Sequence, residues 1–240
     1  MAPTLLLSRG LVAAGTALFQ RALNAVDDTA LAAPTALAGW TRAHVVAHVA
    51  ANAEALVNLA TWARTGVETP MYASPEQRND DIETGAQLPA ARLREWFGSS
   101  AASLDTALEA LTSEEWTSPV RTAQGRTVPA TEVPWMRTRE VMIHAVDLDA
   151  GVGFDDLPAE FLAEALAEAT AKRSASGGGP ALELVTTDEG APRQSWSVAG
   201  AGEAVHVRGP LAQLAAYVTG RHSEHLTTDS PAVPVLPPWL

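Results

Sequence analysis

The chain has 240 residues, no cysteine and a formal net charge of -12 at pH 7. This acidic balance disfavours binding to nucleic acid or to an anionic membrane surface, so neither partner is expected. The absence of cysteine excludes disulfides, thiolate metal sites and a cysteine nucleophile, so any thiol chemistry must be carried by a bound small molecule. The length admits one large domain or two of modest size.

The first 150 residues are predicted to form four amphipathic helices. Apolar residues, mostly alanine and leucine, recur there at the three- and four-residue spacing of a helix face. Thr41 precedes one stretch as a candidate N-cap, and the fixed φ of Pro134 suits the first turn of another. The predicted helices, which together indicate a bundle, cover residues 5–26, 41–64, 90–111 and 134–150.

The N-terminal stretch "TLLLSRGLVAAGTALF" is apolar but is interrupted by Ser8 and Arg9. No uninterrupted apolar run in the chain reaches the roughly 18 residues of a membrane-spanning helix. The stretch also lacks a convincing signal-peptide cleavage site. We therefore expect a soluble, cytoplasmic protein with no membrane partner.

Two connections between the predicted helices are longer than the roughly two to eight residues usual in bundles. They cover residues 66–87 and 118–133, and both are predicted to be loops. Long loops in a compact domain are often functional. The mixture of Met71, Tyr72 and prolines in the first loop with Gln124 and Arg126 in the second favours a binding lid over a solvated tether.

The pattern changes after Gly151, where a domain boundary is placed between residues 1–150 and 151–240. A helix is predicted over residues 158–173 and a closing helix over residues 210–221. Between them, "ALELVTT", "RQSWSVA" and "AVHVRG" have the partial alternation of short strands. The predicted fold class is therefore mainly α with a second, smaller α/β domain. The proline-rich tail "PAVPVLPPWL" is expected to pack against the body.

The segment "REVMIH" places Glu140 and His144 four residues apart, on one face of a predicted helix. His48 lies among apolar residues of another predicted helix, and facing helices of a bundle are a natural place for a metal. These three ligands would leave a coordination position open, as in catalytic zinc sites, although other divalent metals accept the same donors. The alternative is a hydrogen-bonded pair of Glu140 and His144 with His48 as a satisfied core histidine.

Other residues carry weaker signals. The position of Arg221 near the end of the last predicted helix favours an interpretation in which it caps that helix. The functional alternative is that it binds an anion. Asp147 and Asp149 are candidates for orienting a metal-ligating histidine, but a solvated helix face is the commoner explanation. Trp40 and Trp135 favour core or interdomain packing over cofactor stacking.

The segments "GWTRAHVVAHVAANA", "ETPMYASPEQRND", "TAQGRTVPA" and "WMRTREVMIHAVDL", with "PPWL" at the end, are similar to those of mycothiol-dependent maleylpyruvate isomerases. The resemblance covers essentially the whole chain. It implies a DinB-like four-helix bundle over residues 1–150 that carries the metal site. It also implies that residues 151–240 form a smaller α/β domain contributing to the active-site cleft. Finally, it implies a zinc ion held by His48, Glu140 and His144, with Arg221 as a catalytic residue.

The same resemblance implies that mycothiol acts as the thiol cofactor and maleylpyruvate as the substrate, in gentisate-type aromatic degradation. Reversible thiolate addition to the cis double bond would give an enolate with a single bond, and elimination after rotation would give fumarylpyruvate. Zinc would activate the thiol, the substrate or both. Arg221 would hold a carboxylate or stabilise the enolate. Gln124 and Arg126 are candidate cofactor-binding residues because of their place in the second long loop. The expected assembly is a monomer or small homo-oligomer.

Three other functions fit parts of the pattern. A mycothiol S-transferase would use the same metal ligands but release a stable conjugate. A non-catalytic, metal-stabilised binding protein, dimeric through its apolar tail, would hold the metal without turnover. Hydrolysis by a zinc-bound water would need a general base, and none is evident in the motif helices.

Overall fold

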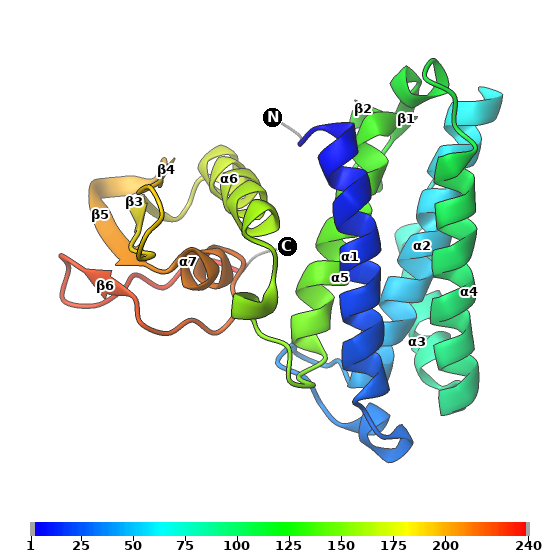
Figure 1. The fold of residues 1–240 in the computed structure, drawn as a ribbon, viewed down its shortest axis with the longest axis horizontal. Helices are drawn as coiled ribbons and strands as arrows, with labels where there is room; N and C mark the ends of the chain where they lie inside the picture. Colours follow the sequence, from blue (N-terminus) through cyan, green and yellow to red (C-terminus); the bar gives the residue numbers. More distant parts are fainter. Residues whose placement is uncertain (1–2, 239–240) are drawn as a thin grey trace. The chain divides into compact units, whose positions relative to one another are not determined.

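The computed structural model describes residues 3–238, and Trp239 and Leu240, the last residues of the "PPWL" match, lie outside this range. The chain divides into two compact units, Pro3–Val152 and a second that begins at Gly153. The first is helical and the second combines helices with a small sheet (Figure 1). The predicted class, mainly α with a smaller α/β part, is confirmed at this level. No helix within the described residues combines the length and apolar character required to cross a bilayer.

The helical unit contains the four predicted long helices and one more. The long helices are α1 (Leu5–Asn24), α2 (Arg42–Thr65), α4 (Ala90–Glu109) and α5 (Val133–Asp147), and the additional one is α3 (Pro75–Ala86). Helix α1 packs along α5, whereas α2 contacts α3, α4 and α5 (Figure 1). As predicted, Thr41 is the N-cap of α2 and Pro134 lies in the first turn of α5.

Close packing of the long helices depends on small residues as well as large ones. Phe19 of α1 and Phe97 of α4 are fully buried, with ring centroids 4.8 Å apart. A Cβ added at Gly15 of α1 would lie 2.5 Å from a methyl carbon of Val141 on α5. The glycine therefore lets the two backbones approach more closely than alanine would.

The prediction of a loop over residues 66–87 is wrong for its second half, which forms α3. Ser74 caps this helix by accepting the Gln77 N–H at 3.1 Å, and Pro75 occupies its first turn. The helix buries little apolar surface, chiefly at Ile82 and Gly85, so no apolar stripe marks it in the sequence. A Cβ at Gly85 would lie 2.5 Å from the ring of Trp96, so the helix docks through its glycine.

The prediction of a loop over residues 118–133 is also wrong in part. Strands β1 (Pro119–Arg121) and β2 (Thr127–Pro129) form an antiparallel hairpin that a short 3-10 helix joins to α5. Each strand is only three residues long and has a single buried valine, Val120 or Val128, so its alternation is too brief to detect.

The second unit is built on a four-stranded sheet of order β4-β3-β5-β6. Its elements are α6 (Ala159–Ser176), β3 (Pro180–Thr186), β4 (Ser195–Val198), β5 (Ala201–Gly209), α7 (Leu211–Val218) and β6 (Thr227–Thr228). Strands β3 and β5 are parallel, with Leu184 opposite Val207, and the other pairs are antiparallel. The two-residue strand β6 was not predicted, and α7 ends three residues before the predicted Arg221.

The C-terminal tail packs against the second unit, as expected for its described part. Val233 and Leu236 contact the core that the sheet shares with α6 and α7. Tyr217 donates a hydrogen bond from its hydroxyl to the Pro234 carbonyl at 2.6 Å, and Arg173 donates one to the Pro237 carbonyl at 3.1 Å. These contacts fix the tail without regular secondary structure.

Candidate metal centre

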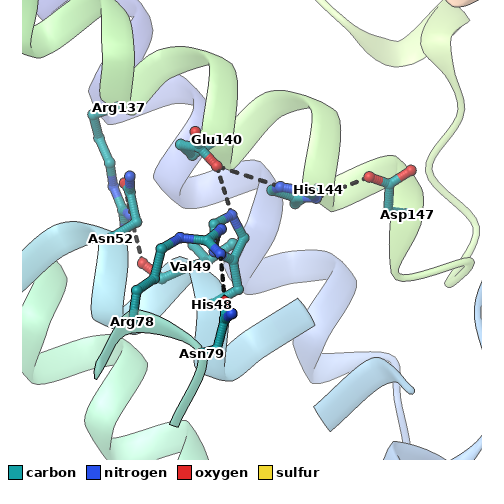
Figure 2. Close-up of polar contacts among 9 residues, drawn as sticks. All are labelled: His48, Val49, Asn52, Arg78, Asn79, Arg137, Glu140, His144 and Asp147. Atoms are coloured by element: carbon teal, nitrogen blue, oxygen red, sulfur yellow. Dashed lines mark hydrogen bonds and ion pairs between the residues drawn. The ribbon is translucent and has the colours of Figure 1, made fainter. Parts of the chain in front are cut away.

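Helices α2 and α5 bring His48, Glu140 and His144 together inside the helical unit (Figure 2). The Nε2 atom of His48 lies 2.8 Å from Oε2 of Glu140, and Nε2 of His144 lies 3.3 Å from the same oxygen. The two imidazole rings meet edge to face, with centroids 4.8 Å apart. One carboxylate oxygen therefore faces a nitrogen from each helix.

This donor set fits a divalent metal. One ligand atom from each of the three residues lies within 4.8 Å of the others, and His48 is buried. Two imidazole nitrogens and a carboxylate oxygen suit zinc and related metals, and three protein ligands leave room for a further ligand. The buried carboxylate of Asp147 lies 2.8 Å from Nδ1 of His144, which leaves Nε2 of that histidine directed at Glu140.

The surroundings shift the pKa values of the three side chains, upward for His144 and downward for His48 and Glu140. Burial lowers the pKa of His48 despite its hydrogen bond to Glu140. Burial also disfavours the charged form of His144, but hydrogen bonds to Asp147 and Glu140 outweigh this effect and raise its pKa to about 9. For Glu140, burial favours the acid, yet hydrogen bonds to both histidines hold its pKa well below the usual value. A metal cation would replace the positive charge of protonated His144.

Aromatic and cationic side chains border His48. The ring of Trp40 lies 5.3 Å from the His48 ring, so Trp40 is part of the site's surroundings. On the other nitrogen of His48, Nδ1, the guanidinium of Arg78 lies at 3.3 Å (Figure 2). Arg78 also lies over Tyr72, 5.9 Å from the ring centroid. Burial raises the pKa of Tyr72 to about 12 although Arg78 opposes the shift, so this phenol stays neutral at pH 7.

A second arginine, Arg137 of α5, is fully buried beside the site. It donates hydrogen bonds to the Val49 carbonyl at 2.6 Å and to the Asn52 side-chain oxygen at 3.1 Å, which ties α5 to α2 (Figure 2). Its other terminal nitrogen has no hydrogen-bond partner among the described residues. Burial lowers the pKa of Arg137 to about 10, which still leaves the guanidinium charged at pH 7.

Gln124 and Arg126, the candidate cofactor-binding residues, lie in the turn between β1 and β2, and both are exposed. Arg126 forms an ion pair with Glu132 at 3.4 Å. The hairpin precedes α5, and Glu140 is seven residues into that helix, about 10 Å along its axis from Val133. Among the described residues, the ion pair of Arg126 joins it to Glu132 and not to a metal ligand.

Arg221 belongs to the second unit and follows the end of α7. Its backbone N–H donates to the Ala216 carbonyl at 2.9 Å, and its guanidinium donates to the Thr219 carbonyl at 2.7 Å. Both hydrogen bonds satisfy carbonyl groups at the helix end, as the capping interpretation predicts.

The remaining candidate residues differ in their burial and in their partners. Asp147 is buried against His144, so the expectation of a solvated face is wrong for this residue. Asp149 is highly exposed and pairs with Arg42, which matches that expectation. Trp135 is buried in the core. Arg78 was missed entirely, because its helix was predicted to be loop.

The chain is similar to a known protein family and to solved structures. The family model described as the mycothiol maleylpyruvate isomerase N-terminal domain matches residues 12–149, which contain all three candidate ligands. A crystal structure of a mycothiol-dependent maleylpyruvate isomerase is similar over 99% of this chain and 98% of its own, with 43% identity and a TM-score of 0.92. A histidine-to-alanine mutant of such an isomerase has the same identity and coverage and a TM-score of 0.91.

A search of curated protein sequences finds no match. The family model nevertheless covers more than half of the chain, and the structural similarity extends over nearly all of it. The chain therefore belongs to the mycothiol maleylpyruvate isomerase family.

Proposed function

We propose that this protein catalyses the mycothiol-dependent isomerisation of maleylpyruvate to fumarylpyruvate. The observation that carries the proposal is the 43% identity over 99% of the chain to a mycothiol-dependent maleylpyruvate isomerase, including its C-terminal part. We also assign the helical unit to the DinB-like four-helix bundles, with α3 as an addition to α1, α2, α4 and α5. Gentisate-type aromatic degradation and a cytoplasmic location are parts of the same proposal.

The residues proposed to hold the metal are His48, Glu140 and His144, and zinc is the metal that we propose. When bound, the ion would lower the pKa of a coordinated thiol or polarise a substrate oxygen. Asp147 would keep the His144 ring oriented with Nε2 toward the ion, since its carboxylate lies at hydrogen-bond distance from Nδ1. Burial of His48 would keep this imidazole neutral and able to ligate.

The thiol has to come from a small molecule, because the chain contains no cysteine. Reversible addition of the mycothiol thiolate to the substrate alkene would leave a single bond about which the molecule can rotate, and elimination would break the new carbon–sulfur bond and regenerate the thiol, with no net change in protons or electrons. Arg221 is proposed to hold a substrate carboxylate or to stabilise the enolate charge. Gln124 and Arg126 are proposed to bind mycothiol, on the basis of their place in an exposed hairpin turn.

The test is conversion of maleylpyruvate by purified protein of known metal content, with mycothiol, with glutathione and without thiol. Fumarylpyruvate formed only with mycothiol, and no consumption of the thiol, is the expected result. His48→Ala should lose metal and activity together, whereas His222→Ala, which changes an exposed histidine, should keep both. A stable mycothiol conjugate would instead identify an S-transferase, and an active, metal-free His48→Ala variant would exclude the assigned ligands.

A further inference from the structure

Arg78 of α3 places a positive charge beside the candidate metal centre. Its guanidinium lies 3.3 Å from Nδ1 of His48, the ring nitrogen that does not face Glu140 (Figure 2). We propose that Arg78 binds a carboxylate of the substrate next to the metal. This inference rests on the proposed function, since it assigns a role within the same site.

The charge of Arg78 is available for an anion. Within residues 3–238, no carboxylate lies within ion-pair distance of its guanidinium, and its other polar contacts are with the side-chain oxygen of the adjacent Asn79 at 3.3 Å and with the Tyr72 side chain. Arg137 cannot take this role, because it is fully buried and bonded to α2. Arg78 is only half-buried, and it is therefore the arginine of this site that a ligand can reach.

The contact with His48 is one that a bound metal would break. A guanidinium has no acceptor, so in this hydrogen bond Nδ1 of His48 must accept, and a neutral ring then carries its proton on Nε2. A metal on Nε2 requires the lone pair of that nitrogen, which moves the proton to Nδ1. An Nδ1–H group cannot accept from Arg78. With Nε2 of His48 engaged by a metal, the guanidinium of Arg78 would lose this acceptor, and its N–H groups would be available to an anion.

The surroundings favour a carboxylate as the new partner. The planar guanidinium presents paired N–H donors that match the two oxygens of a carboxylate. Tyr72, which lies under the guanidinium, remains neutral and supports the cation through its ring face. The chain has a net charge of -12, so a dianionic substrate needs a local cation of this kind.

The test compares zinc-loaded wild-type protein with Arg78→Gln and Arg78→Lys, and Arg64→Gln serves as the control. Arg64 is an exposed arginine of α2, so its substitution changes the net charge equally away from the site. The measurements are KM and kcat for maleylpyruvate at saturating mycothiol, the KM for mycothiol, and the dissociation constant of the unreactive dianion maleate by calorimetry. Metal content is determined for every variant.

Arg78→Gln should raise the KM for maleylpyruvate and the maleate dissociation constant together, by about 10- to 100-fold. Metal content and the KM for mycothiol should not change, Arg78→Lys should recover part of the loss, and Arg64→Gln should match wild type. Unchanged maleate binding in Arg78→Gln, absence of maleate binding in the wild type, or an increase confined to the mycothiol KM would overturn the inference. If the protein has no isomerase activity but binds maleate in a way that depends on Arg78, the proposed function is refuted and the carboxylate site at Arg78 is retained.

Discussion

His144 and Asp147 form a buried pair in the last turn of α5, with Nδ1 of the imidazole 2.8 Å from a carboxylate oxygen. The side chain of Asp147 is only 2% exposed, so the contact is shielded from solvent. The pair fixes which nitrogen of His144 faces Glu140 and makes that nitrogen a stronger ligand.

Asp147→Asn should weaken zinc affinity by about 10- to 100-fold without unfolding the protein. An amide oxygen can still accept from Nδ1, so ring orientation is retained while the negative charge is lost. Competition with a chromogenic chelator measures the affinity. Asp149→Asn is the matched control, because Asp149 is exposed and pairs with Arg42. Equal zinc affinities in the two variants would contradict a role for the buried carboxylate.

The chelator-treated protein should lose stability as the pH is raised from 6.5 through about 9. The pKa of His144 is about 9 in the folded chain and 6.5 in the reference state. A raised folded-state pKa stabilises the fold fully below the unfolded value, and this stabilisation disappears above the folded value. The pKa values of His48 and Glu140 are lowered, so these two groups change protonation below this pH range. We expect a loss of about 1–3 kcal/mol in the free energy of unfolding.

Urea unfolding at pH 6.5 and pH 9 measures this difference. Asp147→Asn should reduce the difference in unfolding free energy between the two pH values, because the substitution removes a hydrogen-bonded charge that raises the pKa of His144. A wild-type unfolding free energy that stays constant across the interval, or an equal decrease in both proteins, would show that His144 is not the group responsible.

Arg221→Ala should abolish most isomerase activity and leave zinc content unchanged, if the arginine binds substrate. The hydrogen bonds that Arg221 makes to Ala216 and Thr219 allow a different outcome, in which the variant unfolds more easily because the end of α7 is less well capped. The backbone contact survives substitution, so the expected cost in stability is small, about 0.5–1.5 kcal/mol. Activity, zinc content and urea midpoint together separate the catalytic from the capping role.

Gly85→Ala should destabilise the helical unit by about 1–3 kcal/mol. The new methyl group would lie 2.5 Å from the Trp96 ring and 2.9 Å from Cβ of Ala47, so the Trp96 ring or the packing of α3 on α2 must shift. Gly98→Ala is the control on α4, where nothing lies within 4 Å of the added Cβ. That substitution should stabilise the helix by about 0.5–1 kcal/mol. Thermal unfolding of both variants gives the comparison, and a stabilised Gly85→Ala variant would contradict the close contact.

The errors of sequence-based prediction lie where local patterns are short or depend on partners. Helix α3 is not predicted from the sequence because its buried face consists of Ile82 and Gly85. The hairpin is not predicted because each of its strands has only one buried residue. The spacing of Asp147, three residues after His144, already makes it a candidate to orient that histidine. Its burial could not be predicted, since this depends on what packs over the end of the helix.

The sequence by itself determined the long helices, the change from helical to α/β structure and the pairing of Glu140 with His144, because each depends on local periodicity. Family resemblance, also read from the sequence, supplied the function that the comparisons support. Only the tertiary structure decided that His48 faces Glu140, that Asp147 is buried and that Arg78 borders the site. These relations join residues of different helices or depend on burial, and helix packing, which no local pattern encodes, sets the distances between them.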